Sequence, residues 1–143
     1  MTSVREVTAM LIDDGLELLD EAECTALLSS CHVGRVGITV AGLPVILPVN
    51  FTWIDGSIVF RTGAGTKLHA ASNGAVIAFE LDDYDAGTAS GWSVLAIGRA
   101  THITDADQSA DLEARVERPW AEGPRDHFVR LTPELLTGRR LAH

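Results

Sequence analysis

The chain has 143 residues, 46% of them hydrophobic, and carries 20 acidic against 11 basic residues, for a formal net charge of −9. This length and apolar content predict one globular domain over residues 1–143. The negative charge would repel a phosphate backbone and no basic stripe offsets it, so we expect no nucleic-acid partner. No run is apolar enough to cross a bilayer and no signal peptide precedes the domain, so we expect no membrane partner and a cytoplasmic location.

The first predicted element is a helix in "DEAECTALLSSCH", which follows an N-terminal arm over residues 1–19. Asp20 is the expected N-cap, with Glu23 three residues later as its capping-box partner. Cys24 and Cys31 share one apolar face of this helix, about 10 Å apart, which is too far for a disulfide. We therefore interpret both cysteines as core residues rather than as redox or metal groups.

From residue 33 the sequence pattern changes to strands. "VGRVGITV" and "PVILPVNFTW" are joined by an Ala-Gly turn and predict a hairpin, and Asp55-Gly56 predicts a second hairpin turn into "SIVFRT". Pro44 and Pro48 have no amide hydrogen to donate to a neighbouring strand. The strand that contains them is therefore expected to have an edge, a bulge or a ligand along part of its length.

The second half of the chain alternates helices and strands. A short helix is expected over residues 66–72, then a strand "AVIAFELDD", an acidic loop "DYDAGTASG", the long strand "GWSVLAIGRATHI", and a helix from residue 105 that breaks at Pro119. A last strand "HFVRLTP" leads into a C-terminal tail over residues 132–143. Hairpin-connected strands of this kind favour a mainly β fold, an antiparallel barrel or sandwich, over a parallel α/β sheet.

The stretch "IVFRTGAGTKLHAA" predicts an anion site at the end of a strand. It fits neither the Walker A spacing nor the dinucleotide fingerprint, because the lysine follows Thr66 and no third glycine is present. Arg61 and Lys67 supply cations, Thr62 and Thr66 supply hydroxyls, and the following helix begins with unpaired amides. The alternative is a plain strand-to-helix turn with two solvated cations.

Four segments in order, "ECTALLSSCHVGRVG", "GLPVILPVNFTW", "DGSIVFRTGAGTK" and "GWSVLAIGRA", resemble the pyridoxamine 5′-phosphate oxidase-like FMN-binding split β-barrel family, in particular its small bacterial members. The resemblance implies an antiparallel split β-barrel that forms a homodimer, with two FMN molecules at the subunit interface.

The resemblance also implies roles for individual residues. The segment Pro48-Val49-Asn50-Phe51 is expected to run along the isoalloxazine through its backbone, while Arg61, Thr62 and Lys67 hold the ribityl phosphate, with Thr66 as a further donor. Trp92 and Ser93 are expected to reach the flavin from the other subunit. No side chain is required as a general acid or base, so we predict no catalytic residue.

The function that follows is an FMN-dependent oxidoreductase with a small-molecule substrate. The chain lacks the basic and histidine residues with which the full oxidase grips pyridoxal phosphate, which speaks against that particular reaction. The open alternatives are an F420-dependent reductase on the same fold and a non-enzymatic flavin-binding or haem-binding module.

Several charged residues are left with two interpretations each. The five histidines form no short ligand pair, so no metal site is expected. His69 either faces the cofactor or is an exposed helix residue. Arg139 and Arg140 either approach an anionic ligand or lie in a solvated end, and the acidic loop from Asp82 to Asp85 is either a solvated connection or a lid.

Overall fold

The computed structural model describes residues 5–7 and 16–141, except for the side chain of Lys67. These residues form one eight-stranded sheet with the order β3-β2-β6-β7-β8-β5-β4, in which β1 pairs with β8 and every pairing is antiparallel. The strands are β1 (Glu17–Leu19), β2 (Val33–Val40), β3 (Leu43–Asn50), β4 (Thr52–Ile54), β5 (Ser57–Thr62), β6 (Val76–Asp85), β7 (Ser90–Ile103) and β8 (His127–Leu141). The predicted mainly β, antiparallel fold is confirmed.

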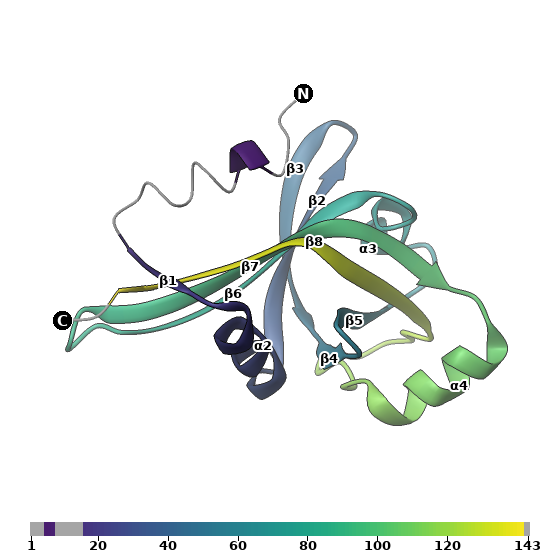
Figure 1. Cartoon of the computed structure of the whole chain (residues 1–143). Helices are drawn as coiled ribbons and strands as arrows, with labels where there is room; N and C mark the ends of the chain where they lie inside the picture. The colour runs from purple at the N-terminus through teal and green to yellow at the C-terminus, as the bar shows by residue number, and fades with distance from the viewer. Residues whose placement is uncertain (1–4, 8–15, 142–143) are drawn as a thin grey trace.

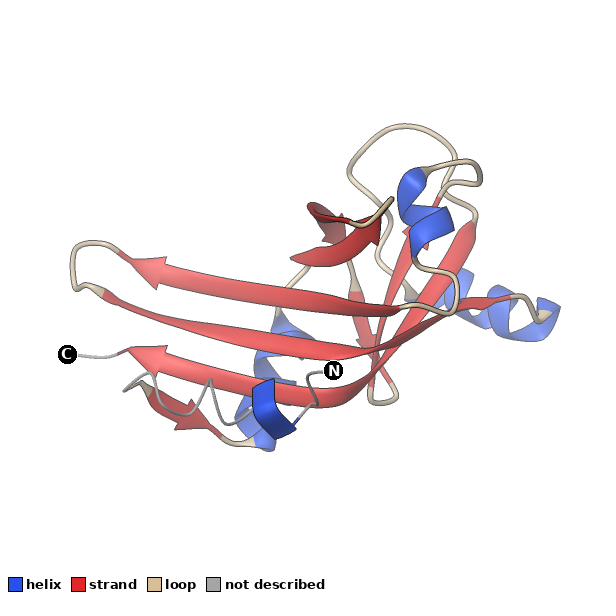
Figure 2. Ribbon diagram, turned by 90° about the horizontal axis from the view of Figure 1, so that it is seen from above, coloured by secondary structure: helices blue, strands red, loops and turns tan. Residues whose placement is uncertain are grey.

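The sheet is strongly curled (Figure 1). Three helices longer than one turn lie around it, and residues 5–7 form a single helical turn. The helices are α2 (Glu21–Ser30), α3 (Lys67–Ala71) and α4 (Ala106–Arg115). Figure 2 shows the long strands β6, β7 and β8 running side by side, with α4 beyond one end of them. No helix in the described part of the chain is long and apolar enough to span a membrane.

The curl of the sheet arises at Phe51, where the predicted strand "PVILPVNFTW" proved to be two strands. β3 pairs with β2 at one edge of the sheet, whereas β4 pairs with β5 at the other. Phe51 is buried with its ring 4.7 Å from that of Phe79, and its amide donates to the His32 carbonyl. This anchoring directs the chain across the core, so consecutive strands join opposite edges and bend the sheet into a half-barrel. The predicted edge along the proline-containing strand is confirmed.

Local turn and cap chemistry agrees with the sequence. Asp55 and Gly56 both have positive φ, at 51° and 77°, as the two-residue hairpin turn requires. The Asp20 side chain accepts from the Glu23 amide at 2.8 Å and begins α2. Cys24 is buried and unpaired, as predicted, and burial raises the pKa of its thiol. Gly138 of β8 makes room for this sulfur, because a Cβ there would lie 2.6 Å from it.

Three predicted boundaries were wrong. The acidic loop is strand, because β6 continues to Asp85 and pairs with β7 along its full length. The tail from residue 132 is also strand, because β8 pairs with β7 as far as Leu141. Part of the N-terminal arm joins the sheet as β1, while residues 1–4 and 8–15 lie outside the described part. The polar side chains in these segments do not show the apolar alternation that predicts a strand. Hydrogen bonds between neighbouring backbones hold these strands in the sheet instead.

Strand β5 is buried on both faces, and this decides the geometry of the site. Ile58 and Phe60 point into the main core, while Val59 packs into a smaller cluster with Leu112 and Phe128 beneath α4. Because side chains alternate along a strand, Arg61 continues the face of Val59 and Thr62 continues the face of Phe60. The two residues predicted to hold one phosphate together therefore leave β5 on opposite sides.

Candidate functional site

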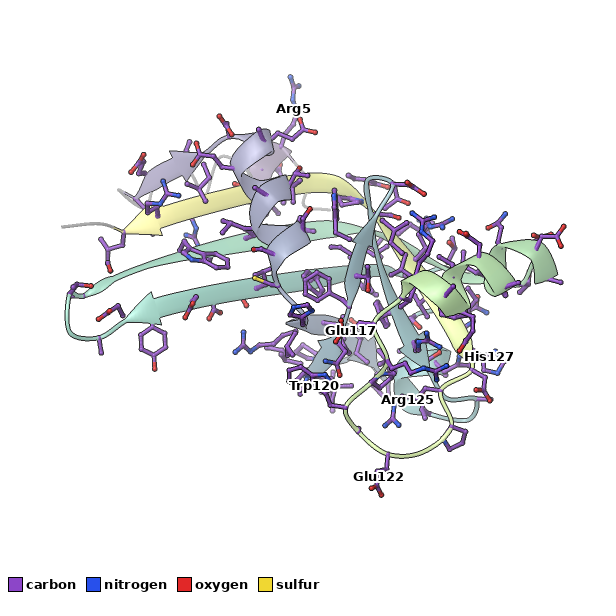
Figure 3. All side chains as sticks on the ribbon, turned by 90° about the horizontal axis from the view of Figure 1, so that it is seen from below. Arg5, Glu117, Trp120, Glu122, Arg125 and His127 are labelled. Atoms are coloured by element: carbon purple, nitrogen blue, oxygen red, sulfur yellow. The ribbon has the colours of Figure 1, made fainter. Side chains whose placement is uncertain are left out.

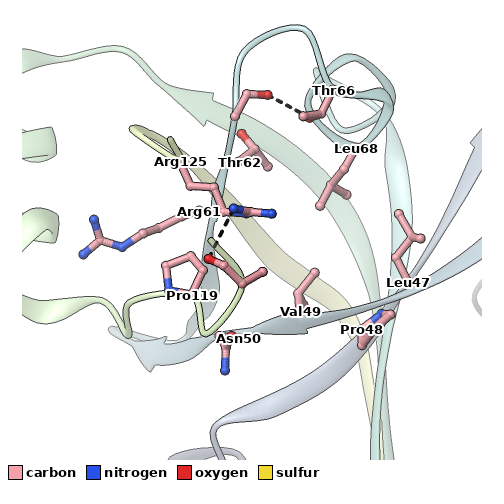
Figure 4. A pocket seen from close by; sticks show the side chains of 12 residues that line it. Leu47, Pro48, Val49, Asn50, Arg61, Thr62, Thr66, Leu68, Pro119 and Arg125 are labelled. Atoms are coloured by element: carbon pink, nitrogen blue, oxygen red, sulfur yellow. Dashed lines mark hydrogen bonds between the residues drawn. The ribbon is translucent and has the colours of Figure 1, made fainter. Parts of the chain in front are cut away.

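A cavity of about 320 Å³ lies between the end of β3, the turn after β5 and the loop after α4 (Figure 4). This volume is within the range of small-molecule sites. Its lining residues come from these three segments and from α3: Leu47, Pro48, Val49, Asn50, Arg61, Thr62, Gly63, Thr66, Leu68, Pro119, Ala121 and Arg125. Six of the predicted cofactor-binding residues thus meet at one place, namely Pro48, Val49, Asn50, Arg61, Thr62 and Thr66.

Arg61 has contacts within the protein that the sequence reading did not predict. Its guanidinium points away from the cavity towards α4, where its side chain is only 2% exposed (Figure 4). It donates to the Glu113 carboxylate at 2.8 Å and to the Glu113 and Val116 carbonyls at 3.1 and 2.9 Å. The guanidinium also lies 4.9 Å from the centre of the Phe128 ring. Arg61 therefore caps the C-terminal end of α4, and its hydrogens are committed to the protein.

Some of the polar groups in the turn after β5 form hydrogen bonds within the turn itself. The Thr66 hydroxyl donates to the Gly63 carbonyl at 2.7 Å and accepts from the His69 amide at 3.1 Å, so it caps α3. Gly63 is required by the fold, because a Cβ there would lie 2.6 Å from the Pro124 carbonyl. Gly65 differs: its φ is +80° and nothing lies within 4 Å of its Cβ position. Its side of the turn is open to a ligand that approaches the backbone.

Two other predicted positions have different outcomes. The side chain of Phe51 belongs to the core, so any ligand contact there is limited to the backbone, as the resemblance implied. Lys67 begins α3, but its side chain lies outside the described residues. Its assignment to the phosphate remains a prediction.

Arg125 is the cation that the sequence reading missed. It comes from the loop between α4 and β8, and its guanidinium lies in the cavity that Arg61 turns away from (Figure 4). Its Nη1 donates to the Glu122 carbonyl at 2.7 Å and more weakly to those of Ala121 and Gly123. All three bonds use one nitrogen, so within the described part of the chain Nη2 and Nε keep their hydrogens for an anion. The segment "EGPRD" has no hydrophobic periodicity. The one signal that could have predicted a binding residue here is an arginine beside a Gly-Pro turn.

The loop that carries Arg125 is tied to the strands across the cavity. The Glu117 amide donates to the Thr52 hydroxyl at 2.7 Å, and the Trp120 amide donates to Asn50 Oδ1 at 2.9 Å. His32 Nδ1 also lies 3.1 Å from Glu117 Oε2. Figure 3 shows Trp120 and Arg125 on this loop, with Glu122 directed outward. Asn50 thus uses its side chain to position the loop and retains its backbone for a ligand.

Trp92 and Ser93 lie elsewhere, on β7 near the tip of the β6–β7 hairpin. They line a separate surface cavity with Tyr84 and Arg139, remote from the one just described. Arg140 pairs across the strands with Trp92 and forms an ion pair of 3.4 Å with Glu23 of α2. One chain therefore does not bring Trp92 and Ser93 to the first cavity, and their approach from a second subunit remains a prediction.

Three histidines that are far apart in sequence gather behind the turn. The ring of His69 lies 4.2 Å from that of His102 and 4.8 Å from that of His127, measured between ring centres. His69 Nδ1 is 2.8 Å from the Thr62 hydroxyl, and His102 Nε2 is 3.2 Å from the Ser72 hydroxyl. His69 is thus neither exposed nor inside the cavity. In the described part of the chain, no group of three histidine, cysteine or acidic residues is arranged to hold a metal ion.

The family model of pyridoxamine 5′-phosphate oxidase matches residues 20–140 of this sequence. The chain belongs to the pyridoxamine 5′-phosphate oxidase family. A relative within it, protein Rv0080 of Mycobacterium tuberculosis, is 39% identical over 128 residues, which are 86% of this chain and 84% of that protein. The resemblance stated from the sequence is confirmed.

Two FAD-binding proteins have solved structures with the same fold. The FAD binding protein from Mycobacterium smegmatis is 34% identical with a TM-score of 0.76, covering 90% of this chain and all 100% of that one. An FAD-binding protein from Mesorhizobium loti shares the fold at 21% identity and a TM-score of 0.72, covering 90% of this chain and 98% of that one. The split-barrel fold is thereby confirmed.

The cavity fits the anionic end of a flavin in this member of the pyridoxamine 5′-phosphate oxidase family. Among the described residues, Nη2 and Nε of Arg125 have no hydrogen-bond partner, and Gly63 and Thr66 of the turn line the cavity beside it. Leu47, Val49 and Leu68 supply an apolar wall against which a ring system can pack. The residues that would hold the phosphate are therefore Arg125 and the turn, rather than Arg61.

Proposed function

We propose that this protein binds FMN in the cavity between β3 and the loop after α4 and acts as a flavin-dependent oxidoreductase on a small molecule. The observation that carries the proposal is the meeting of Arg125, the turn residues Gly63 and Thr66, and the apolar end of β3 around one cavity. The flavin-binding relative at 34% identity supports it independently. When bound, the flavin would supply the electron or hydride transfer.

The protein's own residues would bind and orient the cofactor. Arg125 would pair with the phosphate, and the backbone from Pro48 to Asn50 would lie along the ring system because β3 is an edge strand with unpaired groups on its outer side. Pro119 and Ala121 would cover the cavity from the loop side. No described side chain in the cavity is a carboxylate or a histidine, so we expect no general acid or base there.

The proposed assembly is a homodimer in which Trp92 and Ser93 of each subunit complete the site of the other. Their distance from the cavity within one chain is the reason for the proposal, since only a second copy would bring them to it. Sedimentation of the cofactor-loaded protein is expected to show a dimer. A flavin-loaded monomer would contradict the shared site.

The experiment that tests the function is an absorption spectrum of the purified protein after addition of FMN and removal of free ligand. We expect retained flavin bands near one FMN per chain, and loss of the bands on addition of NAD(P)H if the protein is a reductase. Retention of neither FMN nor FAD would overturn the proposal. An absorption spectrum of F420 or haem would assign the protein to one of the alternative classes instead.

FAD is the second candidate cofactor. The FAD binding protein from Mycobacterium smegmatis covers 90% of this chain at 34% identity, which favours FAD directly. Competition between FMN and FAD for the same preparation distinguishes the two. Because both carry the flavin ring and a phosphate on the ribityl chain, the proposed contacts of Arg125 apply to either one.

A further inference from the structure

The three histidines behind the turn form a cluster whose protonation no acidic residue balances. They come from three elements: His69 from α3, His102 from β7 and His127 from β8. His127 pairs with Thr62 in the β5–β8 ladder, so the backbone itself places this ring behind the cavity. In the described residues, none of the three rings has a carboxylate partner by hydrogen bond or ion pair.

The surroundings of the cluster disfavour positive charge. Burial is the main cause that lowers the pKa of His102 below its usual 6.5, and the charges of His69 and His127 add to it. Among the described side chains, Arg125 lines the same cavity as Thr62, and Arg61 pairs with Glu113 on the opposite face of β5. Asp126 adjoins His127 in sequence, and in the described residues it forms no hydrogen bond or ion pair with any of the three rings. Protonation of this cluster would thus strengthen the binding of an anion beside it.

Thr62 connects the cluster to the cavity. Its hydroxyl lies 2.8 Å from His69 Nδ1, and Thr62 also lines the cavity. When Nδ1 is unprotonated, the hydroxyl donates its hydrogen to the ring and has none left for a ligand. When His69 is protonated, Nδ1–H becomes the donor and the hydroxyl hydrogen must find another acceptor. A phosphate oxygen in the cavity is such an acceptor.

We propose that His69, His102 and His127 form a proton-dependent part of the anion site, through which a phosphorylated flavin binds more tightly as the pH falls. This inference rests on the proposed function, since the anion in question is the flavin phosphate. His69 acts as a positioning residue through Thr62, and His102 and His127 set how readily it takes a proton. The positive charge of the cluster and the freed hydroxyl hydrogen act in the same direction.

The coupling between proton binding and flavin binding sets the size of the change in flavin affinity. An anion within about 6 Å typically raises the pKa of a histidine by about one unit. Because the coupling of proton and ligand binding is reciprocal, the ligand then binds about tenfold more tightly below both pKa values than above them. We therefore expect an approximately tenfold rise in affinity between about pH 8 and about pH 5.5, the range in which histidine titrates.

The test uses FAD, whose pyrophosphate stays fully ionised in this range, whereas the phosphate of FMN titrates near about pH 6 and would mask the effect. The dissociation constant is measured by flavin fluorescence at both pH values for the wild type, His69→Gln and His102→Gln. Riboflavin, which has no phosphate, is the ligand control. Asp107→Asn is the protein control, because it removes an exposed titratable group in the first turn of α4, outside both the cluster and the cavity.

The expected result is a tenfold tightening of FAD in the wild type and in Asp107→Asn, no tightening of riboflavin, and a dependence of at most about twofold in His69→Gln. Equal wild-type affinity at the two pH values would overturn the inference. So would an unchanged dependence in a folded His69→Gln protein, because the responsible group would then lie elsewhere.

A second measurement remains decisive if the variants do not fold or if no flavin binds. Histidine pKa values of the wild type are followed by NMR with and without inorganic phosphate. A rise in the pKa of His69 or His102 on phosphate addition supports the cluster, and no change overturns it. Absence of flavin binding at every pH would refute the proposed function alone, since the phosphate titration answers the question about the cluster separately.

Discussion

Arg61 at the end of β5 and Arg125 in the loop after α4 line one cavity, and they differ in what their guanidinium groups contact. Arg61 is buried and binds the Glu113 carboxylate and two carbonyls at the end of α4. Arg125 binds only carbonyls of its own loop through one nitrogen. A cation in a glycine-rich turn is therefore not by itself an anion ligand; what matters is which donors the fold has left unpaired.

The largest expected effect is on stability at Arg61. Arg61→Ala would leave the Glu113 and Val116 carbonyls without their donor and remove the buried guanidinium that pairs with the half-exposed Glu113, at a cost of about 3–5 kcal/mol in the free energy of unfolding. Chemical denaturation without ligand measures it.

Arg118→Ala is the matched control for this change. Arg118 binds the same Glu113 carboxylate but its side chain is 77% exposed, so the expected loss is below about 1 kcal/mol. Equal losses in the two variants would show that burial does not distinguish these arginines.

The next effect is on ligand affinity at Arg125. Arg125→Ala would remove a charge-assisted contact worth about 1.5–3 kcal/mol. The dissociation constant for FMN should therefore rise roughly ten- to hundredfold, with little change in the free energy of unfolding. Titration of flavin fluorescence measures it, with Arg115→Ala as a control of equal charge change on the exposed side of α4. An unchanged affinity in Arg125→Ala would refute the assignment of the phosphate to this residue.

A smaller effect is expected where the loop is tied to β3. Asn50→Ala would remove the acceptor of the Trp120 amide, a hydrogen bond worth about 1 kcal/mol, and exchange of that amide hydrogen should quicken about fivefold. Asn50→Asp keeps the acceptor oxygen and should exchange nearly as slowly as the wild type. If both variants exchanged alike, the side chain of residue 50 would not hold the loop.

The smallest effect concerns Arg35, the exposed counterpart of Arg61. Its Nη1 lies 3.2 Å from both Glu80 and Asp82 on the outer face of the sheet. Burial first, and then Asp82, raise the pKa of Glu80 from 4.5 to about 7 despite Arg35. The folded state thus holds a proton that the unfolded state releases, so stability is lost as the pH rises from about 4.5 through about 7.

The test of this effect is a series of denaturation midpoints from pH 5 to pH 8. The midpoint of the wild type should fall relative to that of Glu80→Gln, which cannot ionise at this position. Parallel curves for the two proteins would show that Glu80 titrates normally. The side chain of Glu80 is 37% exposed, so solvent screening keeps the difference small.

The family, the antiparallel β class and most turns were predictable because they depend on local chemistry. Asp55-Gly56 adopts positive φ wherever it occurs between strands, Asp20 caps whatever helix follows it, and the two prolines mark an edge strand in any sheet. The position of the cavity followed only in part: the pattern placed "RTGAGT" at the end of a strand, whereas "LPVN" was predicted within a longer strand and ends β3 only in the structure.

The tertiary structure alone decided which side chains reach the cavity. Alternation along β5 already implied that Arg61 and Thr62 diverge, but only the packing of α4 showed that Arg61 faces a helix rather than a ligand. Arg125 and the cluster of His69, His102 and His127 depend on contacts between residues distant in sequence. No local pattern encodes such contacts, because they form only when the curled sheet brings separate strands and loops together.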